Sequence, residues 1–372
     1  DGKILWIIDG YTTSAGYPNS RVVNLANTGD ALTSRSNAVS SLDDRNVNYI
    51  RNSVKATVDA YDGTVSLYQW DDKDPVLSTW SKAFPGSVKP RSEISADLLA
   101  HVRYPEDMFR VQRDILSAYH VTTADAFYGG QDFWRVPLDP SSFGANSANQ
   151  PPYYLTMQIP GQSKPTFSLY TPFVPRGGRE NLTALAVVNS DAGDEYGKIT
   201  VLQLPRSTNI AGPSQVSSNF EAKPEVATSL SLLRQGGSDV VLGNLLTLPV
   251  GKGLLYVQPV YVRATGNTAA YPLLQKVLVS FGDQIGFSET LQGALDQVFG
   301  GNSGTTVSDN QQSTSTPGGA GTSQAIRAAI SSLQSAYADL EAAQKRLDGA
   351  AEDRARARVK AAIAALISAQ NR

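Results

Sequence analysis

The sequence predicts an α+β protein in which mainly antiparallel sheets pack against helices, with a C-terminal α-helical hairpin after a flexible linker. Three observations indicate this class. Strand-like segments dominate residues 150–263, helical patterns cluster around residues 75–120, and one antiparallel strand pair can be assigned from its turn. Because strands and helices are segregated along the chain, a doubly wound parallel sheet is not expected.

The assigned strand pair covers Val47–Tyr61 and Thr64–Trp70, with Asp-Gly at positions 62–63. An Asp-Gly pair favours a two-residue type I′ turn, because both central residues of that turn need a positive φ. This turn places Lys55 opposite Trp70 on a polar face and leaves the alternating apolar residues on the other face. The alternation and the turn predict the same register.

Turn-forming residues separate the other predicted elements. Further strands are predicted over Tyr153–Ile159, Phe167–Phe173, Leu182–Val188, Lys198–Leu204, Leu254–Arg263 and Val277–Phe281. Helices are predicted over Pro75–Phe84, Ser92–Val102, Pro105–Tyr119, Pro224–Arg234 and Glu289–Phe299. In the third helix Pro105 suits the first helical position. Its buried stripe is expected to consist of Met108, Val111, Ile115 and Tyr119.

Composition divides the chain into three parts. Residues 1–300 form the α+β domain, in which a boundary between two subdomains can fall near residues 140–150. Residues 301–323 consist almost entirely of Gly, Ser, Thr, Asn and Gln and are expected to form a flexible linker. Residues 324–372 are Ala-rich with heptad-spaced apolar positions, and Asp-Gly at 348–349 offers a stop, so an antiparallel helical hairpin is predicted.

The composition excludes several kinds of protein. The 372 residues are 41% hydrophobic and carry a net charge of -2, so neither a disordered chain nor a nucleic-acid-binding protein is indicated. There is no Cys and there are only two His, which excludes disulfides, thiolate metal sites and multi-histidine centres. Because the chain begins with Asp1 and contains no membrane-spanning apolar run, we expect a soluble piece of a longer protein.

Common catalytic and cofactor motifs are missing from the sequence. It holds no phosphate-binding loop, no dinucleotide fingerprint and no nucleophile elbow, so no cofactor is predicted. His101 and His120 each lie near the end of a predicted helix. A histidine there interacts favourably with the helix dipole and commonly caps carbonyl groups, so we assign both a structural role.

Two acidic loops are the candidate metal sites, because carboxylate oxygens suit a hard cation such as Ca²⁺. They contain Asp71, Asp72 and Asp74 in the first loop, and Asp191, Asp194 and Glu195 in the second. Neither loop has EF-hand spacing. The alternative is that both are solvated loops and that Asp74 caps the helix that follows it.

The polar face of the strand pair is the candidate binding surface. Its members are Arg51, Lys55, Asp59, Tyr68 and Trp70. Cationic and aromatic side chains together could bind an anionic glycan or a lipid head group. The alternative is an ordinary exposed sheet face on which Lys55 forms a cation–π pair with Trp70.

Several segments of the sequence carry a family resemblance. The longest is VNYIRNSVKATVDAYDG at residues 47–63. The others include AFPG at 83–86, RYPED at 103–107, QPPYY at 150–154, YGKITV at 196–201, GNLLTLPVG at 243–251 and YVQPVY at 256–261. These segments resemble a family of bacterial multi-pass membrane proteins, uncharacterised protein family 0182. The resemblance covers most of residues 1–300, and the helical tail is similar to the C-terminal segment of the family.

The resemblance implies a location and partners but no chemistry. Family members carry several N-terminal transmembrane helices and a large extracytoplasmic part, and this chain resembles the C-terminal portion of that part. The partners it implies are the transmembrane region of the same protein, absent from this chain, and an envelope lipid, glycan or other envelope protein. No catalytic residue can be transferred from the family.

Three functional interpretations therefore stay open at the level of sequence. The first is a non-catalytic extracytoplasmic domain that binds or scaffolds at the outer face of the membrane. The second is a carboxylate-based enzyme acting on envelope glycan or lipid, which requires acidic groups that converge in a cleft. The third is the external substrate-binding domain of a transporter, which requires a deep pocket with few polar groups.

Overall fold

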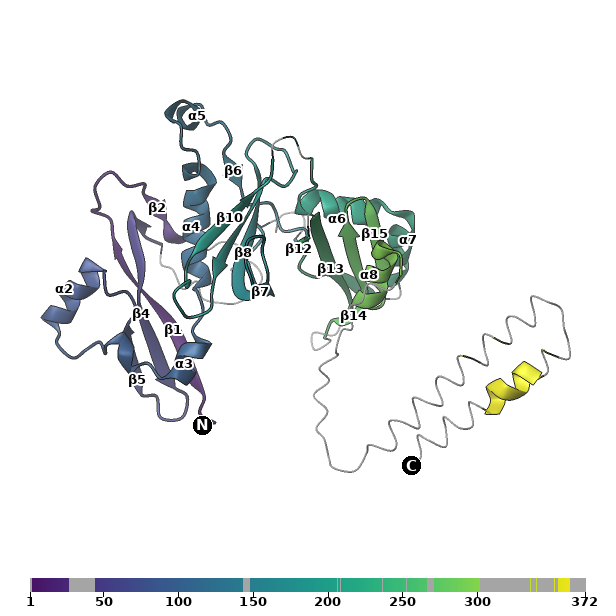
Figure 1. Ribbon diagram of the computed structural model, residues 1–372, viewed down its shortest axis with the longest axis horizontal. Helices are drawn as coiled ribbons and strands as arrows, with labels where there is room; N and C mark the ends of the chain where they lie inside the picture. The colour runs from purple at the N-terminus through teal and green to yellow at the C-terminus, as the bar shows by residue number, and fades with distance from the viewer. Residues whose placement is uncertain are drawn as a thin grey trace. The chain divides into compact units, whose positions relative to one another are not determined.

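A computed structural model describes residues 2–26, 44–142, 148–205, 207, 209–235, 237–251, 253–265, 271–301, 335, 339, 351 and 354–361. The chain divides into two compact units, Asp1–Thr306 and Val307–Arg372 (Figure 1). The predicted linker beyond residue 301 and most of the predicted helical hairpin lie outside the described residues.

In the described residues of the first unit there are three larger antiparallel sheets and one two-stranded ribbon. The N-terminal sheet has the order β1-β4-β5, formed by Leu5–Ser14, Tyr49–Asp59 and Val65–Gln69. Strand β1 was not predicted, because its segment carries no turn signal that pairs it with a neighbouring strand. A two-stranded ribbon, β2 at Val23–Asn24 and β3 at Asn46–Val47, lies between β1 and β4 in sequence.

The β4–β5 hairpin corrects the predicted turn. Lys55 lies opposite Tyr68 and not opposite Trp70, so the register differs by two residues while the faces are kept. The connection is a longer loop that closes with a hydrogen bond from Asp59 N to Thr64 O at 3.0 Å. Side chains cap it, since Asp62 Oδ1 accepts from Thr64 N at 2.8 Å, and only Gly63 adopts a positive φ.

The middle sheet has the order β10-β9-β8-β6, with β7 also pairing with β8. Its strands are β6 at Trp134–Arg135, β7 at Tyr153–Met157, β8 at Thr166–Pro175, β9 at Ala184–Asn189 and β10 at Ile199–Gln203. The central strands β8 and β9 are buried along nearly their whole length. The four longer strands confirm the predicted ones.

The C-terminal sheet has the order β11-β13-β14-β15, with β12 pairing with β13. Its strands are β11 at Ser238–Leu242, β12 at Leu246–Val250, β13 at Gly253–Ala264, β14 at Leu273–Phe281 and β15 at Gln284–Ser288. Helix α8 at Leu291–Phe299 covers one face, and α6 at Pro213–Ala222 and α7 at Pro224–Leu233 contribute to the core on the other.

The middle and C-terminal sheets share one apolar core. Tyr170 and Val187 from the middle sheet belong to the same buried cluster as Tyr256, Val260 and Leu278 from the C-terminal sheet. Two polar contacts reinforce this junction. Gln150 Nε2 donates to Leu245 O at 2.8 Å, and Thr247 N donates to the Tyr170 hydroxyl at 3.2 Å. The two sheets therefore form one packed body.

The remaining helices precede or flank the middle sheet. They are α2 at Pro75–Ala83, the 3-10 turn η1 at Arg91–Glu93, α3 at Ala96–His101, α4 at Glu106–Tyr119 and α5 at Ala124–Tyr128. The helix predicted over Ser92–Val102 is thus divided into two pieces. The Ser95 side chain caps the second piece by accepting from Leu98 N at 3.1 Å.

The predicted buried stripe of α4 is wrong in part. Val111 is buried, but Met108 and Ile115 are half-buried and Tyr119 is 52% exposed. The helix face that packs against the middle sheet instead carries Phe109, which is fully buried. Arginines are buried on α4 as well, and an apolar pattern cannot indicate a buried face that contains charged residues.

The structure confirms the α+β class. In the second unit residues 354–361 are helical, and Arg358 Nη1 lies 2.9 Å from Asp339 Oδ2. The helix agrees with the predicted hairpin, and the turn between its two arms lies outside the described residues. None of the helices in the described part of the chain is long and apolar enough to cross a membrane.

Asp74 connects α2 to the N-terminal sheet. Its carboxylate caps the helix by accepting from Val76 N and Leu77 N. It also accepts hydrogen bonds of 2.6 Å from the hydroxyls of Thr12, Ser53 and Tyr49. Burial opposes ionisation of this group, but these hydrogen bonds prevail and lower the pKa of Asp74 to about 2.

We expect Asp74→Ala to lower the free energy of unfolding by about 3 kcal/mol, because a helix cap and several charge-assisted hydrogen bonds are lost. The folded-state pKa lies below the unfolded value of about 3.9, so the stabilisation is complete above pH 4 and disappears as the pH falls toward 2. Urea unfolding between pH 7 and pH 2 measures both effects. The exposed neighbour Asp72→Ala is the control, and an equal loss in both variants would contradict the assignment.

Candidate functional site

The polar face of the strand pair is buried at Lys55 and Trp70, whereas Arg51, Asp59 and Tyr68 are half-buried, so the face is less open than the sequence predicts. Lys55 is only 2% exposed and Trp70 8% exposed. Trp70 packs edge-on against Tyr196 with ring centroids 5.0 Å apart, and the guanidinium of Arg91 lies 4.0 Å from the Trp70 ring centroid. The opposite, apolar face is the more open one, with Trp6 65% exposed.

Each predicted member of this face is engaged within the protein. Lys55 forms an ion pair with Asp9, donates to the Tyr196 hydroxyl at 3.1 Å and lies 5.2 Å from the Trp70 ring centroid. Other contacts join Arg51 to Asp71 at 2.6 Å, Asp59 to Lys3 at 3.5 Å, and Lys89 to the Tyr68 ring at 5.7 Å. The cation–π pair of Lys55 and Trp70 is therefore confirmed, but in a buried setting.

The two acidic loops lack the geometry of a metal site. Within the described ranges no group of three or more His, Asp or Glu side chains is placed to hold a metal ion. In the first loop Asp71 pairs with Arg51 and Asp74 is the helix cap, while Asp72 is exposed. In the second, Asp191 accepts from Phe167 N at 3.0 Å, Glu195 pairs with Lys198 at 2.5 Å and Asp194 is exposed.

Both histidines contact backbone carbonyls at helix ends, as predicted. His101 Nδ1 lies 2.7 Å from Asp97 O in α3. His120 Nδ1 lies 2.8 Å from Leu116 O in α4, and its Nε2 lies 2.9 Å from Asp132 O. The His120 ring also stacks on Trp134 with centroids 3.3 Å apart.

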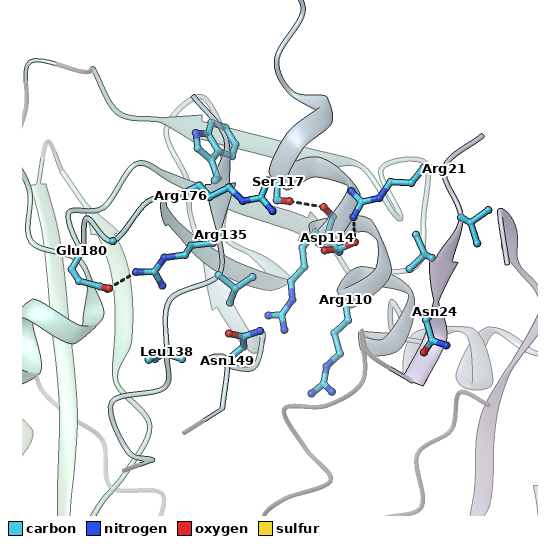
Figure 2. A pocket seen from close by; sticks show the side chains of 16 residues that line it. Arg21, Asn24, Arg110, Asp114, Ser117, Arg135, Leu138, Asn149, Arg176 and Glu180 are labelled. Carbon is cyan, nitrogen blue, oxygen red and sulfur yellow. Dashed lines mark hydrogen bonds and ion pairs between the residues drawn. The ribbon is translucent and has the colours of Figure 1, made fainter. Parts of the chain in front are cut away.

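A cationic pocket of about 730 Å³ is the strongest candidate site in the described part of the chain (Figure 2). It opens between α4, the segment around β2, β6 and the loop after β8. Five arginine side chains from these four elements line it: Arg21, Arg110, Arg113, Arg135 and Arg176. We call it the arginine pocket.

Three of the five guanidinium groups pair with carboxylates. Figure 2 shows Arg135 paired with Glu180 on one side of the pocket and Arg21 with Asp114, at 3.3 Å, on the other. The third pair joins Arg110 to Glu106 one helical turn away. Arg113 and Arg176 form no ion pair with any residue that the structure describes.

Arg113 is the least compensated charge in the pocket. It is 4% exposed, and its Nη1 donates to two neutral oxygens, Gln150 O at 2.9 Å and Thr171 Oγ1 at 3.3 Å. Burial, together with the nearby charge of Arg110, lowers the pKa of Arg113 to about 9. A buried cation without a counter-ion costs several kcal/mol, so an anion that enters the pocket relieves this cost.

Further groups shape the pocket. Trp134 is 3% exposed and lines it, and its Nε1 has no hydrogen-bond partner among the described residues. A backbone hydrogen bond holds the loop that carries Glu180, because Gly212 N donates to Glu180 O at 2.9 Å. A Cβ at Gly212 would lie 2.1 Å from the same oxygen, so a side chain there would displace the loop.

Sequence reasoning missed the arginine pocket. Its five arginines come from positions between 21 and 176, and no spacing connects them. The available signal was Arg110 and Arg113 within one amphipathic helix, three residues apart and therefore neighbours on its surface. The apolar stripe of the same helix predicts a different buried face, so the hydrophobic pattern does not single out these two arginines.

The fold is that of an α+β domain built from antiparallel sheets, with a cationic pocket beside helix α4. The chain belongs to the uncharacterised protein family UPF0182, whose family model matches residues 1–233. It is 48% identical over its whole length to a UPF0182 protein of Leifsonia xyli, covering 42% of that relative. It is 56% identical over 81% of its length to one from Thermobifida fusca, covering 30% of that relative.

The chain thus spans less than half the length of these relatives. The chain is also 48% identical over its whole length to a UPF0182 protein of Paenarthrobacter aurescens, of which it covers 39%. No solved structure matches the chain. The family membership and the partial coverage agree with the resemblance found in the sequence.

Replacing Lys55 tests whether its ion pair with Asp9 stabilises the fold. We expect Lys55→Met to lower the free energy of unfolding by about 3 kcal/mol, because it leaves the Asp9 carboxylate without its cation. Adding Asp9→Asn should restore part of the loss, and the exposed Lys73→Met is the control. Chemical denaturation measures all three variants. A stability of Lys55→Met equal to that of the control would show that this ion pair contributes nothing.

Proposed function

We propose that this chain is a non-catalytic, extracytoplasmic ligand-binding domain of a multi-pass envelope protein, and that the arginine pocket binds an anionic group. The observation that carries the proposal is Arg113, a buried guanidinium in a pocket without a carboxylate partner in the described residues. Arg176 is a second unpaired guanidinium at the same pocket. Two unpaired positive charges match a dianion.

A phosphate group fits this arrangement better than a carboxylate. The planar guanidinium donates in a fixed fork that matches phosphate oxygens, and a phosphate monoester carries a charge of about -1.5 to -2 at pH 7. The indole ring of Trp134 lines the same pocket. We therefore assign the pocket to a phosphate-bearing ligand.

The two carboxylates of the pocket favour binding over catalysis. Asp114 pairs with Arg21 and Glu180 pairs with Arg135. A general acid or base must be within reach of the substrate, whereas each of these carboxylates is engaged by a guanidinium. The described residues of the pocket therefore give no support to a carboxylate-based enzyme.

The extracytoplasmic location rests on the family resemblance. Members of the family carry transmembrane segments ahead of a large external part, and the chain covers 42% or less of the relatives quoted above. That leaves ample length in the relatives for such segments. The proposed partners are the transmembrane region of the same protein and an envelope component that bears phosphate.

Thermal unfolding in the presence of inorganic phosphate tests the pocket. We expect phosphate to raise the Tm at constant ionic strength, by the equivalent of about 2.7 kcal/mol at roughly 100 times its dissociation constant. Arg113→Met and Arg176→Gln should each abolish most of this rise. Arg176 is exposed, so its replacement leaves the fold intact, and the equally exposed Arg234→Gln serves as the control. An unchanged Tm in phosphate, or an equal response of all variants, would refute the assignment.

Labelling of the intact protein in cells tests the location. The chain contains no Cys, so Tyr128→Cys introduces a unique thiol in this region at a side chain that is 94% exposed. We expect a membrane-impermeant maleimide to label this position in intact cells that express the full-length protein. The protein without the new cysteine is the control. Labelling that appears only after lysis would place the domain on the cytoplasmic side.

A further inference from the structure

A second pocket, of about 620 Å³, adjoins the arginine pocket and is apolar where the first is charged. Helix α4 supplies much of its wall through Met108, Val111, Ile115, Leu116 and Tyr119. This is the apolar stripe that the sequence predicted as buried, together with Leu116. In the described structure it lines a groove and not a fully packed core, so we call this pocket the apolar groove.

The two pockets are separated by a single segment of chain. Arg21 and Val23 line both of them, and α4 borders both with different faces. The arginines of α4 lie on the side of the arginine pocket. Arg21, which lines both pockets, forms an ion pair with Asp114 of the arginine pocket, and their side chains are 40% and 42% exposed (Figure 2). An ion pair this exposed is weak, so a ligand can displace it at small cost.

We infer that the ligand is an anionic amphiphile, with its phosphate head in the arginine pocket and its hydrocarbon chain in the apolar groove. The inference rests on the proposed function, since it assigns the same arginines to the head group. Charge complementarity selects the head, because Arg113 and Arg176 have no carboxylate partner among the described residues. The apolar groove selects the hydrocarbon chain, because it shares the lining residues Arg21 and Val23 with that pocket and therefore lies next to it.

The half-exposed apolar stripe of α4 explains why a hydrocarbon chain would add to the affinity for a phosphate. Ile115 and Met108 remain partly accessible to water, and an inserted chain removes both its own methylenes and these side chains from water. A phosphate with no chain uses only the arginines, whereas an alkane with no charge leaves Arg113 uncompensated. A molecule with both parts therefore binds more tightly than either part alone.

Alkyl phosphates of increasing length test the inference. Methyl, hexyl and octyl phosphate are titrated by calorimetry against the whole chain, each below its critical micelle concentration, with octyl glucoside as the uncharged comparison. We expect the affinity to rise with chain length, by up to about fourfold for each methylene that enters the groove. Octyl glucoside should bind far more weakly than octyl phosphate.

Variants of the groove separate this inference from the proposed function. Ile115→Gln should remove most of the dependence on chain length and leave the affinity for methyl phosphate unchanged. The control is Leu232→Gln, which replaces a 61% exposed leucine on helix α7 outside both pockets. The melting temperature of each variant shows whether it is folded.

The possible outcomes are distinct. If all three phosphates bind with equal affinity and Arg176→Gln weakens them equally, the amphiphile is excluded and the proposed anion site stands. If none of them binds, both the inference and the proposed function fail. If octyl glucoside binds as well as octyl phosphate, the groove accepts hydrocarbon without the arginines, and the inference is overturned.

Discussion

Burial of the middle sheet on both faces determines where the other parts of the first unit pack. Along β8 and β9, Leu169 and Val188 point to one face, whereas Tyr170 and Val187 point to the other. All four are apolar or aromatic, so each face needs its own cover. Helix α4 covers the first face through Phe109, and the C-terminal sheet with α6 and α7 covers the second. The arginine pocket lies beside α4 as a consequence.

The position of Arg113 follows from this packing. Thr171 lies between Leu169 and Phe173 on the face that α4 covers, and Arg113 donates to its hydroxyl. The helix therefore inserts a cation between itself and an apolar sheet, where hydrophobic side chains would stabilise the fold more. The proposed anion site gives a reason for a charge at this place. A guanidinium that has no carboxylate partner interacts favourably with a bound anion, and water does not supply an equivalent interaction.

The sequence predicted the fold class, most strands and most helices, because turn residues and alternation act over short distances. It failed where the outcome depends on distant partners. The buried position of Lys55 depends on Asp9 and Tyr196, which lie 46 and 141 residues away in the chain. The hairpin register shifted because the side chains of Asp59 and Asp62 cap a longer loop. The arginine pocket escaped detection because four separate elements build it, and only tertiary packing brings them together.

The shared core of the middle and C-terminal sheets also bears on where this protein can be cut. The family model ends at residue 233, in the last turn of α7, yet the cluster that holds Tyr170 continues to Leu278. A chain truncated at 233 would lose all five strands of the C-terminal sheet, and with them much of the cover on one side of β8 and β9. Exposed apolar strands of this kind associate with one another. The end of the family model is therefore not the border of an independently folding piece, and soluble expression requires the residues that follow.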